Sequence, residues 1–173
     1  YDSNFLVKHI VSNKLTDLEK MYSSKYVESD LGDVYTRVKE LLDLGKTVLF
    51  SGCPCQTAGL YSYLQKNYNN LITVSLVCAG VPSKRAYREH LDTLANGRQI
   101  EELSFRNKIK LGWNTGIYIK YKDGTEFVDN VSDEYMNGFL SGLLLRESCF
   151  NCNFKKDYYS DFVIGDFWGI SSL

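Results

Sequence analysis

The chain has 173 residues, of which 44% are hydrophobic and 24% are charged, proportions that are typical of a soluble globular protein. Twenty Lys and Arg residues against twenty-one Asp and Glu residues give a formal net charge of −1. No long basic run is present, so nothing indicates a nucleic-acid or polyanion partner. The longest apolar stretches, such as 71–77, have the length of a strand and are far short of a membrane span.

The cysteines indicate the cellular compartment. There are five, an odd number, and the sequence opens at Tyr1 with no initiator Met and no leader of the signal-peptide type. Such a set fits a disulfide framework poorly and is more typical of metal-binding, reactive or packed thiols in a reducing compartment. We therefore expect a cytoplasmic protein, and we interpret the chain as a fragment of a longer one.

The first half predicts alternating helices and strands. A strand is expected over 5–11, and Thr16 is placed to begin a short helix. A helical period over 34–44 ends at Gly45, where a left-handed cap belongs. Further along this half, buried strands are predicted over 48–51 and 71–77, and helices over 56–64 and 83–94.

The second half begins with a β-hairpin. Two apolar stretches, 117–121 and 126–128, flank Asp123-Gly124, a strong signal for a two-residue turn. A helix over 134–144 and a last strand over 162–164 follow. The whole pattern predicts an α/β fold with a mixed β-sheet and flanking helices, formed as a single compact domain over 1–173 plus the hairpin.

Cysteines follow the predicted strands at the point where ligands of α/β proteins bind. Cys53 and Cys55 come directly after the strand over 48–51, and Cys78 ends the next strand. Open α/β sheets bind ligands beyond the carboxyl ends of their strands, and nearby helix N-termini favour the thiolate form of cysteine. Cys149 and Cys152 lie in a loop before the last strand.

This pattern leaves three kinds of site open. Four converging thiolates suit either a [4Fe–4S] cluster or a structural zinc ion, and Cys78 alone is also compatible with simple packing in the core. The zinc alternative predicts a non-catalytic, zinc-stabilised interaction module. A thiol redox pair of Cys53 and Cys55 ranks last, because a disulfide across one intervening proline is strained.

Six short motifs, in order along the chain, resemble one family. They are SKYVES at 24–29, FSGCPCQ at 50–56 with AGL at 58–60, LVCAGVPS at 76–83, FRNK at 105–108 with GW at 112–113, CFNC at 149–152 and IGDFWGI at 164–170. The chain is similar in this respect to the coenzyme F420 hydrogenase/dehydrogenase beta-subunit family. That resemblance implies an oxidoreductase that binds FAD and a [4Fe–4S] cluster and relays electrons to F420, ferredoxin or another carrier.

The resemblance also implies particular cluster ligands. The cysteine positions of the family match Cys55, Cys78, Cys149 and Cys152, whereas Cys53 stands where members commonly have Thr. Ala79 replaces a common His, which removes a donor beside the expected site. The usual N-terminal ferredoxin-like module is absent from this sequence, so we expect it as a partner in the parent chain and expect the fragment to be catalytically incomplete.

Candidate flavin-binding residues follow from side-chain chemistry within these motifs. Basic side chains neutralise a diphosphate or reduced flavin, aromatic rings stack on the flavin, and glycine or aspartate at a strand end approaches or orients a ligand. The candidates are Lys25, Arg106 and Lys108, then Tyr26, Trp113 and Trp168, then Gly52, Gly80, Gly165 and Asp166. For each, an ordinary role as surface charge, core filler or turn residue stays open. No G-x-G-x-x-G or P-loop motif is present, which disfavours those nucleotide-binding modes.

Overall fold

The computed structural model describes residues 1–130, 132–156 and 159–166. The chain divides into two compact units, each built from segments far apart in the sequence. The first unit comprises Tyr1–Asp30 and Gly80–Phe150, and the second comprises Leu31–Ala79 and Asn151–Leu173. Among the described residues, no helix has the length and apolar character needed to cross a membrane.

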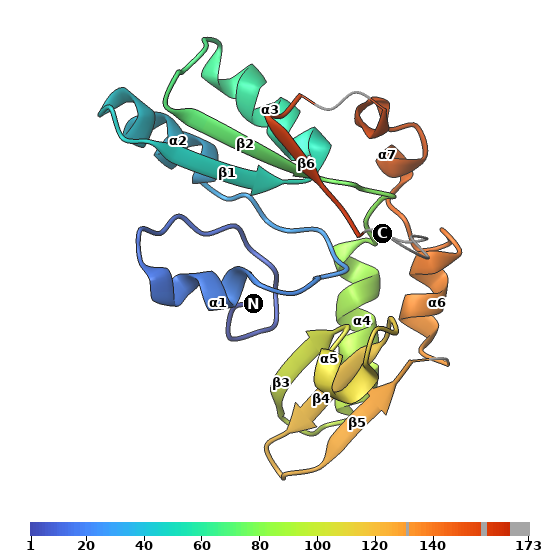
Figure 1. Cartoon of the computed structure of the whole chain (residues 1–173). Helices are drawn as coiled ribbons and strands as arrows, with labels where there is room; N and C mark the ends of the chain where they lie inside the picture. Colours follow the sequence, from blue (N-terminus) through green and yellow to red (C-terminus); the bar gives the residue numbers. More distant parts are fainter. Residues whose placement is uncertain (131, 157–158, 167–173) are drawn as a thin grey trace, which may run out of the picture. The chain divides into compact units, whose positions relative to one another are not determined.

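The second unit is built on a three-stranded parallel sheet. Its strands are β1 (Val48–Gly52), β2 (Leu71–Leu76) and β6 (Phe162–Ile164), in the order β1-β2-β6 (Figure 1). Both strand pairs are parallel. The carboxyl ends of all three strands therefore meet at one edge of the sheet, as the sequence predicts for the β1 and β2 ends.

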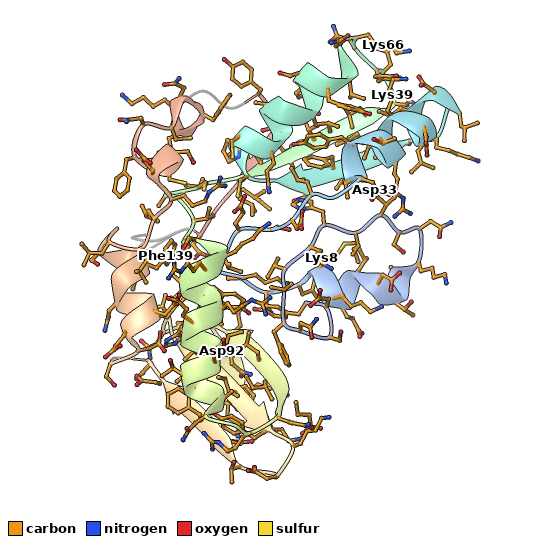
Figure 2. All side chains as sticks on the ribbon, turned by 180° about the vertical axis from the view of Figure 1, so that it is seen from behind. Lys8, Asp33, Lys39, Lys66, Asp92 and Phe139 are labelled. Carbon is orange, nitrogen blue, oxygen red and sulfur yellow. The ribbon has the colours of Figure 1, made fainter. Side chains whose placement is uncertain are left out.

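Two helices pack on this sheet, α2 (Val34–Asp43) and α3 (Pro54–Leu64). The buried residues of α2 recur every four positions, which is the spacing of one helix face, and Gly45 after it has the left-handed φ of +74° that its position predicts. Figure 2 shows Lys39 and Lys66 at one end of this unit, where both donate to Asp43, at 2.6 Å and 3.2 Å.

The two faces of the parallel sheet differ. On the helix-covered face β1 and β2 place their buried side chains, among them Phe50 and the fully buried Thr73 and Ser75. The opposite face exposes large apolar side chains: Leu49, Ile72, Leu76, Phe162 and Ile164. The polar residues on the covered face are therefore interior groups that need partners within the unit.

The first unit contains a three-stranded antiparallel sheet. Its strands β3 (Ile100–Phe105), β4 (Ile117–Tyr121) and β5 (Glu126–Asp129) lie in sequence order (Figure 1). The β4–β5 hairpin confirms the predicted turn, in which Gly124 has a φ of +86°. The core of this unit joins β3 and β4 to helix α4 (Lys84–Ala95).

Shorter helices complete the chain. The first unit also holds η1 (Leu15–Asp17), α1 (Leu18–Met21), α5 (Lys108–Leu111), α6 (Glu134–Leu140) and α7 (Glu147–Phe150), and η2 (Asn153–Lys155) belongs to the second. Ser83 caps α4 by accepting a hydrogen bond from the Ala86 amide at 3.1 Å, as predicted. The helix predicted over 134–144 ends at Leu140, close to Gly142 with its φ of +82°.

The predicted α/β class is confirmed, and parallel and antiparallel pairing both occur, in separate sheets. The strand predicted over 5–11 is wrong, because this segment makes a single bridge, from Lys8 to Asp30, and Phe5 has a left-handed φ of +57°. Strand β3 was not predicted. The expectation that 1–173 forms one domain stays a prediction.

Candidate functional site

Three candidate residues lie at the carboxyl edge of the parallel sheet. Cys55 follows β1, Cys78 follows β2, and Asp166 follows β6. A hydrogen bond connects the ends of β2 and β6 one residue before Cys78: the Val77 amide donates to the Ile164 carbonyl at 2.8 Å. The edge expected to bind a ligand therefore carries both thiol and carboxylate groups.

The turn from β1 into α3 holds Cys55 in the first turn of the helix. Cys53 is the N-cap in an extended conformation, Pro54 begins the helix, and the Gln56 Oε1 accepts a hydrogen bond from the Cys53 amide at 2.9 Å. A Cβ on Gly52 would lie 3.0 Å from Gln56 Oε1. In this structure Gly52 thus leaves room for the side chain that closes the turn, and contact with a flavin stays a prediction.

Tyr35 of α2 braces the same turn. Its hydroxyl donates to the Gln56 carbonyl at 2.6 Å, and a Cβ on Gly59 would lie 2.9 Å from that hydroxyl. Burial, and next the charge of the nearby Cys55, raise the pKa of Tyr35 to about 12. Cys55 therefore has a neutral phenol as a neighbour at any ordinary pH.

Buried hydroxyl groups connect the sheet interior to this turn. Ser75 Oγ donates to Thr57 Oγ1 at 3.1 Å, and Thr57 Oγ1 in turn donates to the Cys53 carbonyl at 3.5 Å. Both Ser75 and Thr57 are fully buried. Because buried hydroxyl groups need partners, this chain of contacts links the position of the cysteine turn to the packing of β2 against α3.

The remaining predicted ligands are near the points where the chain passes from one unit to the other. Cys149 is in the first unit and packs against Gly80, where a Cβ would lie 3.3 Å from the Cys149 Cβ. Cys152 is in the second unit, at the N-cap of η2, and η2 packs against α3. The structure thus places Cys55, Cys78 and Cys152 in one unit and Cys149 in the other.

The thiols fit an iron–sulfur cluster by their chemistry. None of the five cysteines forms a disulfide and none is fully buried, and cysteine side chains are the usual ligands of iron–sulfur clusters. No three His, Cys, Asp or Glu side chains of the described part of the chain converge closely enough to hold a metal ion. Assembly of the four predicted ligands around one cluster therefore stays a prediction.

Two flavin candidates, Tyr26 and Arg106, belong to the first unit. The Tyr26 ring lies edge-on to Phe105 at 5.6 Å and is tilted against Phe139 at 5.2 Å, and Phe105 directly precedes Arg106 in the sequence. Arg106 has a left-handed φ of +50°, and its amide donates to the Gly116 carbonyl at 3.1 Å. Left-handed backbone in a residue other than glycine is strained, and such strain is concentrated at functional sites.

Lys25 already has partners within the chain. Its ammonium donates to the carbonyls of Tyr22 at 2.6 Å and Ser23 at 3.3 Å, just beyond α1. Burial lowers the pKa of Lys25. Lys25 therefore stabilises the end of α1, and a contact with diphosphate stays a prediction.

Lys108 and Trp113 form a pair at α5. The Lys108 ammonium lies 4.7 Å from the centre of the Trp113 ring, and 71% of the Trp113 surface is exposed. This ring is available for stacking, unlike Tyr26, whose ring packs against two others. Trp168, the other tryptophan singled out from the sequence, lies outside the described residues.

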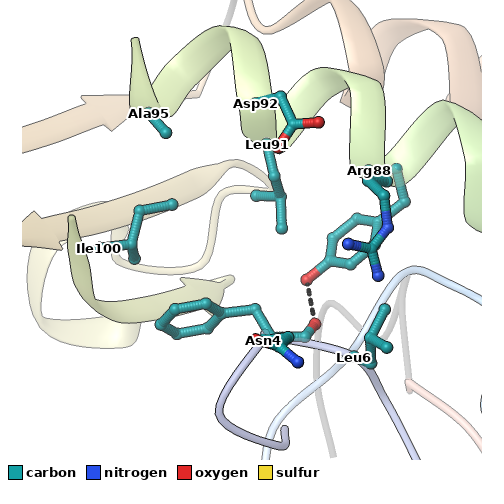
Figure 3. A pocket seen from close by; sticks show the side chains of 9 residues that line it. Asn4, Leu6, Arg88, Leu91, Asp92, Ala95 and Ile100 are labelled. Carbon is teal, nitrogen blue, oxygen red and sulfur yellow. Dashed lines mark hydrogen bonds between the residues drawn. The ribbon is translucent and has the colours of Figure 1, made fainter. Parts of the chain in front are cut away.

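A small cavity in the first unit is lined by none of the candidates (Figure 3). Its volume is about 100 Å³, and its lining comes from the segment around Phe5, from α4 and from the start of β3. The Tyr87 hydroxyl, which donates to the Phe5 carbonyl at 2.8 Å, lies at its wall. Pockets for drug-sized ligands measure about 300–1,000 Å³, so this cavity is too small for a flavin.

Sequence reasoning missed the residues that support the cysteine turn. Tyr35 lies outside the six motifs, and Gly59 lies in the AGL stretch at 58–60. The contact between the two residues joins α2 to α3, and no local sequence pattern predicts it because the residues are far apart in the sequence. Gln56 lies within FSGCPCQ, and its place at the third position after Cys53 was a usable signal, because a capping box puts Gln or Glu there.

Comparison with solved structures gives a similar chain in the F420-reducing [NiFe] hydrogenase complex from Methanosarcina barkeri, studied with xenon. The TM-score is 0.50 at 16% identity, over 84% of this chain and 48% of that chain, so the likeness shows the fold, and this chain spans about half of that one. A search of curated proteins gave no match. The family model for the C terminus of the coenzyme F420 hydrogenase/dehydrogenase beta subunit matches residues 45–172. Since that match covers well over half of the 173 residues, the chain belongs to this family, whose members are oxidoreductase subunits.

Proposed function

We propose that this chain is an electron-transfer domain that binds FAD and a [4Fe–4S] cluster and passes electrons between them to F420 or another acceptor. The observation that carries the proposal is the family match over 45–172, which contains all four proposed ligand cysteines. The fold supports it, because the turn that bears Cys55 and the loop that bears Cys78 lie at the ligand-binding edge of the parallel sheet.

In this proposal Cys55, Cys78, Cys149 and Cys152 hold the cluster. When bound, the cluster supplies one-electron transfer at a potential set by its surroundings. The protein contributes the positions of the thiolates: the first turn of α3 carries Cys55, and the N-cap of η2 carries Cys152. Cys53, whose amide closes the α3 cap, is not among the proposed ligands.

Arg106 is the principal flavin-binding residue of the proposal. A guanidinium makes charge-assisted bonds with phosphate, and the strained backbone of Arg106 indicates a constraint beyond folding. Lys108 with the exposed Trp113 ring supplies a second charge and a stacking face. The remaining proposed contributors are Lys25, Tyr26, Gly52 and Asp166.

The proposed redox partners are F420 or ferredoxin, with a ferredoxin-like module as the entry for electrons. The similar hydrogenase chain belongs to a complex described as F420-reducing, which supports an F420-type acceptor here. We also propose a cytoplasmic location, because five cysteines outside any disulfide suit a reducing compartment.

Anaerobic reconstitution tests this function. The protein is treated with iron and sulfide under argon, and bound iron, sulfide and the visible spectrum are measured beside a variant with Ser at all four ligand positions. We expect about four irons per chain in the parent and loss of most of them in the variant, while Cys53→Ser behaves as the parent. Equal iron uptake by the quadruple variant overturns the ligand assignment, and a colourless parent with one tightly bound zinc supports the interaction module instead.

A further inference from the structure

Gln56 holds the turn that carries Cys55 through its side chain, its amide and its carbonyl. The side-chain Oε1 accepts a hydrogen bond from the Cys53 amide at 2.9 Å, and the backbone amide of Gln56 donates to the Cys53 carbonyl at 2.9 Å. The Gln56 carbonyl accepts from the Tyr35 hydroxyl at 2.6 Å. All of these residues belong to the second unit.

Gly52 leaves room for the Gln56 side chain. A Cβ on Gly52 would lie 3.0 Å from Gln56 Oε1, 3.3 Å from Gln56 Cβ and 3.1 Å from Phe50 Cε1. Gly52 is buried, so an added methyl group has no free space beside it and requires the Gln56 side chain to shift.

The two cysteines of this turn differ in exposure. Cys55 is exposed, whereas Cys53 is half-buried and the intervening Pro54 is buried. Cys53 is the N-cap in an extended conformation, and the helix begins at Pro54. The bond from the Cys53 amide to Gln56 therefore fixes the turn with the first cysteine partly enclosed and the second at the surface.

We infer that Gln56 is a positioning residue for the cluster site, because it presents Cys55 rather than Cys53 at the carboxyl end of β1. Groups that hold a metal ligand in place commonly change metal affinity by about 10- to 100-fold when they are removed. The inference rests on the proposed function only in taking Cys55 as a cluster ligand. It adds the residue that selects between two cysteines separated by a single proline.

A purely structural role for Gln56 makes a different prediction. In that case, any substitution that destabilises the second unit equally would have the same effect on the thiols. Asn70→Ala provides the comparison, since the Asn70 side chain donates to the Lys46 carbonyl at 2.7 Å and to the Leu42 carbonyl at 3.2 Å. These bonds lie at the amino ends of the parallel strands β1 and β2, whereas the cysteine turn follows the carboxyl end of β1.

Thiol labelling in the cofactor-free protein tests the inference without any activity. The protein with all five cysteines is labelled briefly with N-ethylmaleimide near neutral pH, and mass spectrometry measures the ratio of label on Cys55 to label on Cys53. We expect Gln56→Leu to lower this ratio about fivefold, because the loosened turn exposes Cys53. Gln56→Glu, which keeps an acceptor for the Cys53 amide, and Asn70→Ala are both expected to stay within about twofold of the parent.

Gly52→Ala is the second variant, for the case in which Gln56→Leu does not fold. It keeps Gln56 in the sequence and displaces its side chain, so the labelling ratio is expected to fall about threefold. An unchanged ratio in Gln56→Leu, folded by circular dichroism, overturns the positioning role, and where that variant does not fold an unchanged ratio in Gly52→Ala does so. A fall of the same size in Asn70→Ala also overturns it, because stability alone would then set the labelling.

Iron release separates failure of the inference from failure of the proposed function. In the reconstituted protein, a chelator is expected to remove iron from Gln56→Leu about tenfold faster than from the parent, and from Asn70→Ala at the parent rate. A labelling ratio that depends on Gln56, in a parent that binds no iron, removes the cluster and leaves Gln56 as the residue that selects the exposed thiol. Iron that is bound by the parent and held equally well by Gln56→Leu overturns the positioning role and leaves the proposed function.

Discussion

Thr73 of β2 and Asp161, the residue before β6, make three hydrogen bonds with each other. The Thr73 amide and hydroxyl both donate to Asp161 Oδ2, at 2.7 Å and 2.8 Å, and the Asp161 amide donates to the Thr73 hydroxyl at 3.0 Å. The Tyr61 hydroxyl lies 3.0 Å from the same Thr73 oxygen. This pair fixes where β6 begins, and so fixes which residues follow the strand at the candidate site.

Asp161→Ala is expected to lower the free energy of unfolding by about 1–3 kcal/mol near neutral pH, because the amide of the fully buried Thr73 loses its acceptor. Urea unfolding measures this loss. Glu101→Ala, which removes an exposed ion pair with Lys120, is the control, with an expected change of about 0.5 kcal/mol or less. An Asp161→Ala protein as stable as the control would show that the three bonds contribute nothing net.

The contribution of Asp161 depends on pH in a defined direction. The hydrogen bonds from Thr73 lower the pKa of Asp161 below its ordinary value of 3.8. The unfolded state therefore binds its proton first as the pH falls, and the stabilisation is complete above pH 3.8 and is lost below it, through the lowered pKa. Unfolding curves from pH 7 to pH 2.5 should show the gap between parent and Asp161→Ala closing only in that acid range.

Tyr35→Phe is expected to cost about 1 kcal/mol at pH 8, because the hydroxyl loses its bond to the Gln56 carbonyl. The pKa of Tyr35 is raised to about 12 from its ordinary 10, so the unfolded chain ionises first as the pH rises. The stabilisation in the parent is thus full below pH 10 and lost between pH 10 and about 12, and the gap to the variant narrows there.

Tyr63→Phe is the matched control for this substitution. The Tyr63 ring packs against Tyr35 at 5.9 Å, and its hydroxyl meets Thr36 at an exposed position. We expect it to cost about 0.5 kcal/mol or less at pH 8. If the two variants lose the same stability, the brace between Tyr35 and the cysteine turn has no energetic role.

Arg106→Gly is expected to separate stability from flavin binding. Glycine relieves the left-handed backbone at this position, so the free energy of unfolding should stay equal or rise by about 1 kcal/mol. Loss of one charge-assisted contact to phosphate should weaken FAD binding about 10- to 100-fold, measured by flavin fluorescence. Arg85→Ala, which removes a surface pair with Glu89, should change neither quantity. Unchanged FAD affinity in Arg106→Gly, with measurable binding in the parent, excludes Arg106 from the site.

Asp133 joins two structural roles in the first unit. One carboxylate oxygen caps α6 by accepting from the Met136 amide at 2.7 Å, and the other lies 2.8 Å from His90 Nε2. Asp133→Ala should therefore cost about 2–4 kcal/mol, because the cap and a buried partner are lost together. Asp133→Asn keeps the cap, so the difference between its free energy of unfolding and that of the parent, measured in urea, reports whether His90 tolerates a neutral partner. Equal stability of the alanine and asparagine variants would contradict the capping role.

Local patterns in the sequence were sufficient for most of the regular elements. Helix α2 has an apolar period that ends before Gly45, and the two apolar strands of the β4–β5 hairpin are joined through Gly124. Both glycines have a positive φ, and both patterns depend on residues only a few positions apart. Strand β3 was missed because its acidic Glu101 and Glu102 interrupt the apolar pattern. The segment 5–11 was assigned wrongly because strand-like composition does not provide a neighbouring strand with which to pair.

The same division holds for the candidate site. The sequence by itself determined the family and the position of cysteines directly after β1 and β2, because strand ends and helix starts are encoded locally. Only the tertiary structure decided that Tyr35 meets the Gln56 carbonyl 21 residues away and that Thr73 pairs with Asp161 across 88 residues. Contacts at such separations depend on how whole elements pack against one another, and no short stretch of sequence contains that information.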